Sequence, residues 1–140
     1  MSEPTPHEIL NPPELSPPIG FSHAVVAAEG RTVYLGGQTA HGPNGELRGR
    51  TLAEQFDAAA ANVVAALEAA GGRVEHLVSL QIFTTDVGLY RKSTRELATA
   101  YGRHLGRHYP AIALFGVTEL YDPEPLVELV GTAVVPETAA

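Results

Sequence analysis

LVELVGTAVV (residues 126–135) is a run of ten residues with a single charge, that of Glu128. In a β-strand, alternate side chains share a face, so Glu128 lies on the same side as Leu126, Val130 and Val134. Both alternating sets are largely apolar, which predicts a strand covered on its two faces. A carboxylate in such a strand is costly to bury without a partner. Two interpretations of Glu128 stay open: it lies at an edge where its carboxylate reaches water, or its carboxylate lies in a cleft.

The segments before this strand predict an α+β domain with the element order β-β-α-β-α-β-β. The first helix begins at Thr51, because Thr51 and Glu54 have the spacing of a capping box, and ends at Gly71-Gly72. The other elements are expected as a hairpin of strands over 23–30 and 31–38, a strand over 76–86, a helix over about 88–106, and strands over 111–117 and 126–135.

These elements predict a mixed sheet of four or five strands with both helices on one face. No further helix is available to cover the other face, although the last two strands are apolar on both sides. The simplest way to cover the bare face is contact between copies of the chain. We therefore expect an oligomer.

Composition limits the classes of function. The 140 residues carry a net charge of −7 and no cysteine, which excludes disulfides and thiolate metal sites. The basic residues are scattered, so nucleic-acid binding is not expected. No leader segment and no apolar run of about 20 residues is found, which predicts a cytoplasmic protein without a membrane span. We expect a flexible arm over 1–10, one domain over 11–136 and a tail over 137–140.

Several motifs permit more than one interpretation. Gly36-Gly37 can be a β-bulge or a place where another group approaches the backbone closely. His104 and His108 are four residues apart and could form a metal pair, but a solvated helix end is favoured, so no metal site is expected. No nucleophile-elbow, dinucleotide or P-loop pattern is present.

The chain resembles the RidA/YjgF family, also labelled the L-PSP endoribonuclease family, over residues 11–136. The resemblance rests on the order and spacing of several segments: PPIGFSHAV (17–25), VYLGGQTA (33–40), VSLQIFTTD (78–86), Tyr-Pro-Ala (109–111) and VELVGTAVV (127–135). It implies a chorismate-mutase-like fold and a homotrimer with clefts between its subunits. It also implies hydrolysis of imines or enamines to a carbonyl compound and ammonia, without metal or cofactor.

The resemblance also implies site residues. Glu128 matches a family glutamate that positions water or moves protons, and Gly37 and Gln38 match a segment that lines the cleft. Phe21 stands where the family has a tyrosine. Ile112 stands where an arginine holds the substrate carboxylate, which places this chain in a divergent branch.

Three further positions complete the expected binding site: Thr94, where the family has a cleft asparagine, and Ala113 and Leu114, which follow Ile112. Isoleucine offers an apolar wall and no bidentate contact. The ligand is then either neutral and more apolar than a 2-imino acid, or another cation replaces the arginine. Arg91 and Arg95 are the candidates, although a solvated helix face is the favoured interpretation of both.

The favoured function is therefore an enzyme in which Glu128 assists hydrolysis or proton transfer on an imine or enamine. Backbone N–H groups near Gly37 and Ala113 would stabilise developing charge, and desolvation by Phe21, Ile112 or Leu114 would raise the pKa of Glu128. A non-catalytic trimer that binds a small molecule is the alternative. Ribonuclease activity is less favoured because the chain is acidic and has no basic groove.

Overall fold

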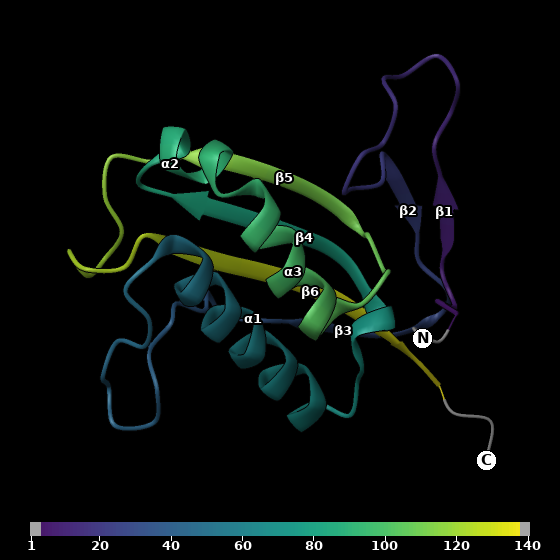
Figure 1. Ribbon diagram of the computed structural model, residues 1–140. Coiled ribbons are helices and arrows are strands. Elements are labelled where there is room, and N and C mark those ends of the chain that lie inside the picture. Colours follow the sequence, from purple (N-terminus) through teal and green to yellow (C-terminus); the bar gives the residue numbers. More distant parts are fainter. Residues whose placement is uncertain (1–3, 138–140) are drawn as a thin grey trace.

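A four-stranded mixed sheet forms the centre of the molecule (Figure 1), as the computed structural model of residues 4–137 shows. The order is β3–β6–β4–β5. Only β4 and β5 run parallel; the other pairs are antiparallel. The strands are β3 (Gly30–Tyr34), β4 (Leu77–Thr84), β5 (Ala111–Gly116) and β6 (Val127–Pro136). The predicted α+β class and mixed sheet are confirmed.

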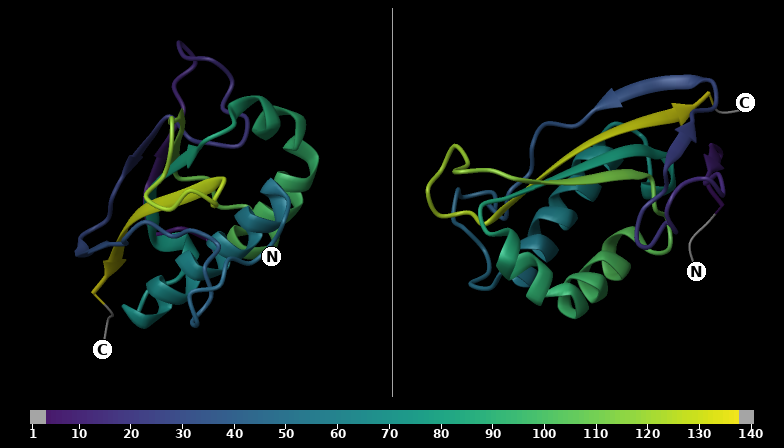
Figure 2. Two further views of the ribbon diagram at one scale, coloured as in Figure 1. Left: turned by 90° about the vertical axis from the view of Figure 1, so that its left-hand side faces the viewer. Right: turned by 90° about the horizontal axis from the view of Figure 1, so that it is seen from above.

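Two long helices cover one face of this sheet and leave the other face bare (Figure 2, right). They are α1 (Leu52–Ala69) and α3 (Thr94–Leu105). The Thr51–Glu54 capping box is present at the start of α1, and Gly71 follows its end with φ +85°. Within residues 4–137, no helix is long and apolar enough to cross a membrane.

The core lies between these helices and the sheet. The apolar stripe of α1 meets the inward residues of the central strands, and all of them are almost fully buried: Phe56, Val63 and Leu67 from the helix, and Leu80, Val127 and Leu129 from the sheet. Burial of each such side chain stabilises the fold by roughly 1.5–3 kcal/mol.

The helix expected over 88–106 is interrupted at Ser93, which separates α2 (Val87–Lys92) from α3. The hydroxyl of Ser93 donates to Leu89 O, and that of Thr94 donates to Arg91 O. Such side-chain bonds compete with the helical backbone pattern and allow the axis to change direction.

The predicted hairpin over 23–38 is wrong. Strand β2 (Ala24–Val26) pairs with β1 (Glu8–Leu10) in a separate two-stranded sheet, whereas β3 pairs with β6. The physical reason is that β6 offers β3 a five-residue antiparallel register, in which Gly30 leaves room for the backbone of Val135.

The pairing of β1 also corrects the expected flexible arm over 1–10, because residues 4–10 are held in place. The hydroxyl of Thr5 donates to Glu75 O, and the His7 side chain is buried. Residues 1–3 and most of the expected tail, 138–140, lie outside the described part of the chain.

His7 fastens this N-terminal segment to the domain, and two further histidines, His76 and His108, are buried near it. His7 accepts a hydrogen bond from Ala28 N through Nδ1 and donates through Nε2 to His76 O at 2.9 Å. His76 belongs to the short 3-10 helix η1 (Val74–His76). His108, just beyond α3, donates through Nε2 to Leu77 O at 2.8 Å.

Burial lowers the pKa of His76, and the nearby charge of Arg73 lowers it further. Burial also lowers the pKa of His108, against a smaller opposite effect of its hydrogen bond to Leu77 O. Near this cluster, Glu75 is buried and pairs with Arg73 at 3.1 Å. The folded state therefore resists protonation of both histidines more than the unfolded state does.

We expect the free energy of unfolding to fall as the pH drops below about 6.5, the ordinary histidine pKa. In that range the unfolded chain binds protons that the folded chain does not, so stability is present at higher pH and lost toward acid. Urea unfolding at several values between about pH 5 and 8 measures the slope. H108Q, which keeps a donor for Leu77 O, should reduce the slope of the free energy of unfolding against pH. H23Q controls for removal of an imidazole outside the cluster, and an unchanged slope in H108Q would contradict the assignment.

Candidate active site

Glu128 points to the bare face of the sheet. Its neighbours along β6, Val127 and Leu129, are buried toward the helices, so the alternation of the strand places the carboxylate on the opposite side. Across the sheet Glu128 is in register with Phe83 of β4, whose ring stacks on Phe115 of β5 with centroids 5.3 Å apart. Glu128 is thus a half-buried carboxylate beside an aromatic pair.

A β-bulge lies opposite Val130, two residues after Glu128 in β6. Leu35 N donates to Gly131 O, and Gln38 exchanges two backbone hydrogen bonds with Leu129. Between these pairings, residues 36 and 37 stand against a single residue of β6, which is the count that defines a bulge. The extra residue carries the chain past the Glu128 side chain.

Gly37 is the residue that Glu128 touches. A Cβ atom on Gly37 would overlap Oε2 of Glu128, whereas a Cβ on Gly36 would meet nothing within 4 Å. Both sequence interpretations of the glycine pair therefore hold, since the segment is a bulge and also a close approach. The structure places Gly37 against Glu128, and Gln38 pairs with Leu129, the next residue of β6.

Two polar side chains of α1 position this arrangement. Gln55, only 3% exposed, accepts a hydrogen bond from Leu126 N at 2.8 Å just before β6. Asn62 donates to Thr39 O and His41 O, both at 2.9 Å, just after Gln38. Sequence reasoning assigned neither role. The available signal was a glutamine and an asparagine next to the apolar stripe of a helix.

Three of the other expected binding residues, Phe21, Ile112 and Ala113, share a hollow. This hollow of about 250 Å³ lies between the N-terminal segment and the start of β5. Its other lining residues are Ser22, His23, Ser79, Leu80, Gln81 and Ala111. Ile112 and Leu114 are in register with core residues of β4 and pack against the core, so their side chains turn toward the helices.

Thr94 lines an adjacent hollow of about 260 Å³ with a largely aromatic wall. The other lining residues are Ile19, Gly20, Phe56, Tyr90, Leu97, Ala98, Tyr101 and Tyr109. The rings of Tyr101 and Tyr109 stack with centroids 5.1 Å apart. Burial raises the pKa of Tyr90 to about 12, so this phenol stays protonated near neutral pH. The two hollows adjoin, because Gly20 and Tyr109 line one while Phe21 and Ala111 line the other.

A single chain therefore presents the expected site in two separate parts. Glu128, Gly37 and Ala113 lie on the bare face, whereas the side chains of Ile112 and Leu114 lie on the helix side of the sheet, and Gln38 is in register with the helix-facing Leu129. Within one chain, Ile112 and Leu114 do not desolvate Glu128 as expected. Strand β4 lies between β5, which carries the two aliphatic residues, and β6, which carries Glu128, and their side chains point to opposite faces of the sheet.

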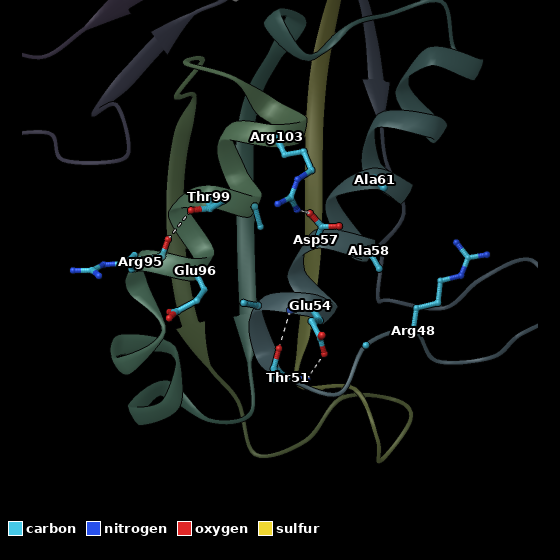
Figure 3. Close-up of a pocket in the computed structure, with 13 residues that line it drawn as sticks. Arg48, Thr51, Glu54, Asp57, Ala58, Ala61, Arg95, Glu96, Thr99 and Arg103 are labelled. Atoms are coloured by element: carbon cyan, nitrogen blue, oxygen red, sulfur yellow. Dashed lines mark hydrogen bonds and ion pairs between the residues drawn. The ribbon is translucent and has the colours of Figure 1, made fainter.

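A hollow of about 780 Å³ lies between α1 and α3 on the outer side of the helices (Figure 3). Asp57 of α1 pairs there with Arg103 and accepts from His104 Nε2 at 3.0 Å, which ties the two helices together. Arg95 lines this groove and Arg91 is exposed, so neither is directed at Glu128.

The structure also separates the two histidines that might have formed a metal pair. His104 bonds to Asp57, whereas His108 bonds to Leu77 O. Among residues 4–137, no three histidine, aspartate or glutamate side chains form a group that could hold a metal ion.

The fold and this arrangement define a class of protein: a small α+β domain whose helix-free sheet face carries one carboxylate packed on a glycine bulge. A model of the family described as Endoribonuclease L-PSP matches residues 13–135. The chain belongs to this family, also called Rid or YjgF. A comparison with curated proteins gives no match.

Solved structures of the family agree with the fold. The Rid-family protein YyfB of Yersinia pestis is 32% identical over 92% of this chain and 98% of its own, with a TM-score of 0.83. A putative endoribonuclease of Thermotoga maritima is 27% identical over 91% and 93%, with a TM-score of 0.67. RidA from an Antarctic Psychrobacter is 28% identical over 82% and 88%, with a TM-score of 0.66.

The contact between Gly37 and Glu128 predicts a selective effect of one methyl group. G37A should displace the Glu128 carboxylate and leave the fold intact, because the φ of Gly37 is not in the left-handed region and Glu128 is a flexible side chain. Carbon-13 NMR of the glutamate side-chain carboxyls should show one shifted signal, assigned with E128Q. G36A is the matched control, with open space at its Cβ. Equal spectra of the two variants would refute the contact.

Proposed function

We propose that this protein is a homotrimeric enzyme that hydrolyses an imine or enamine in a cleft between subunits, with Glu128 as the proton-transfer group. The observation that carries the proposal is the half-buried carboxylate of Glu128, packed on Gly37 on the helix-free face. Within residues 4–137 this carboxylate has no ion-pair partner. It is therefore available to a ligand.

Assembly is supported by the apolar character of the bare face. Tyr34 is 81% exposed and Phe115 is 42% exposed, and Val130 lies between their strands on the same face. Exposed large apolar side chains that share one face support an interaction site there. A second copy could also close over Glu128 and the Phe21–Ile112 hollow, because the lining residues Gln81 and Ala113 lie on the same face as Glu128. A trimer with clefts between subunits is the arrangement that the family resemblance implies.

The reaction can be written with only Glu128 and water. As the water oxygen bonds to the imine carbon, Glu128 accepts a water proton and passes it to the imine nitrogen, which forms a carbinolamine. Glu128 then takes the hydroxyl proton and delivers it to nitrogen, the C–N bond breaks, and the products are a carbonyl compound and ammonia. An enamine first takes a proton at carbon to become the imine.

The backbone around Gly37 supports this chemistry. Its N–H group makes no hydrogen bond within residues 4–137 and lies next to Glu128. A fixed backbone donor of this kind can stabilise the charge that develops on a reacting oxygen. The exposed Ala113 of the edge strand β5 is the second candidate for such a donor.

E128Q should lower the rate of imine hydrolysis by roughly 10²–10⁴-fold, the usual contribution of general acid–base catalysis. The assay follows the decay of imines generated in solution from a panel of amines and amino acids. Q38E serves as a control for a charge change at the neighbouring bulge. Unchanged turnover in E128Q would exclude the proposed role.

A charge placed on the bare face should dissociate the assembly. V130K introduces an ammonium into a surface that becomes buried on association, and an unpaired buried charge is costly. Sedimentation should change from trimer to monomer, with helical circular dichroism retained. K92E, on the exposed side of α2, controls for the change of charge. A monomeric wild-type protein would refute the trimer.

A non-catalytic trimer that binds a small molecule is the second candidate. The apolar and aromatic lining of the hollows beside Phe21 and Thr94 favours it, because these surfaces can hold a ligand without chemistry. Ligand binding without turnover in the panel would support this alternative. Ribonuclease activity is disfavoured, since the face that carries Glu128 presents no basic side chain from its strands.

A further inference from the structure

The sheet face that carries Glu128 has an unusual charge composition. The register of the four strands places eleven other side chains on this face: Thr32, Tyr34, Ser79, Gln81, Phe83, Ala111, Ala113, Phe115, Val130, Thr132 and Val134. None of them is lysine, arginine or histidine. Among these strand positions, Glu128 carries the only charge expected at neutral pH.

The segment that leads into β6 is also acidic. Three exposed carboxylates, Glu119, Asp122 and Glu124, lie in the segment that precedes Glu128. His41 lies 3.8 Å from Asp122, but its charge depends on protonation. Because like charges in proximity repel, a ligand carboxylate beside Glu128 would be disfavoured.

Neither the Phe21–Ile112 hollow nor the hollow beside Thr94 has a lysine or arginine in its lining. His23 is the only basic residue in the lining of the Phe21–Ile112 hollow, and its Nε2 lies 2.7 Å from Ser16 O. The aromatic hollow beside Thr94 has no basic lining residue. These surfaces fit an uncharged, apolar or aromatic group.

From these observations, we infer that the ligand of the Glu128 site is an imine without a carboxylate, bearing an apolar or aromatic arm. The imine is uncharged in solution and becomes a cationic iminium as its nitrogen takes a proton. Glu128 attracts this cation, and the ring of Phe83, which is in register with Glu128, adds a cation–π contribution. The inference rests on the proposed function and specifies its substrate class.

The reaction of this substrate class needs no further reactant. The imine carbon bonds to a water oxygen, its C–N bond breaks, and the nitrogen leaves as ammonia with the protons that Glu128 transfers. The organic product is an uncharged ketone or aldehyde, not a keto acid. The reaction that supplies the substrate is therefore the oxidation of a simple amine or the condensation of a neutral carbonyl compound with ammonia.

A matched pair of substrates tests the inference on the assembled protein. The imines of phenylacetone and phenylpyruvate carry the same aromatic arm. The first has a methyl group where the second has a carboxylate. We expect kcat/KM to be at least about tenfold higher for the phenylacetone imine, from like-charge repulsion of the carboxylate. Q81R should narrow or reverse this ratio, because Gln81 is exposed on the face that carries Glu128 and a guanidinium there can pair with the carboxylate; Q81M is the matched control without charge.

The affinities of the two products, phenylacetone and phenylpyruvate, test the ligand class independently of the proposed hydrolysis. Calorimetry should show tighter binding of phenylacetone than of phenylpyruvate, and E128Q should reduce the difference because it removes the repelling charge. If neither imine is hydrolysed but phenylacetone binds more tightly, the ligand class stands and the hydrolase proposal fails. If phenylpyruvate binds as well or better, if its imine is hydrolysed as fast, or if neither product binds, the inference is overturned.

Discussion

Strand β6 is the element on which the rest of the structure depends. It is hydrogen-bonded to β3 along one edge and to β4 along the other, so its register fixes both halves of the sheet. Its inward residues contact the apolar stripe of α1, while its outward residues form part of the bare face. A shift by one residue would exchange the two sets and bury Glu128 in the core. The cost of burying that charge therefore helps to specify the register.

The position of Glu128 depends on the β-bulge that lies beside β6. The bulge at residues 36 and 37 leaves the space that the carboxylate occupies, and a side chain at Gly37 would fill it. Gln55 and Asn62 hold the two backbone segments that meet here, one just before β6 and one just after the bulge. The same helix that buries the core thus sets the geometry on the other side of the sheet.

The chemistry of the site follows from one carboxylate in surroundings without a matching cation. A structural glutamate would be paired or solvated, whereas Glu128 is half-buried, unpaired within the described residues, and beside stacked aromatic rings. Such a group can move protons and stabilise a developing positive charge. The three arginines that line the groove between the helices lie on the opposite side of the molecule and cannot balance it.

Local patterns in the sequence were sufficient to determine much of this protein. The Thr51–Glu54 capping box, the apolar stripe of α1 and the alternation in LVELVGTAVV each act over a few residues, and each is present as predicted. The sequence also indicated the glycine pair at 36–37 and the carboxylate at 128. Strand pairing was different, because the partner of β3 is a hundred residues away in the chain and a nearby Gly-containing turn suggested a hairpin. The anchoring of His7 was missed for the same reason, since its partners lie on distant segments. Only the tertiary structure decided that Ile112 and Glu128 lie on opposite faces of the sheet, because that relation depends on the register of three strands and not on any local propensity.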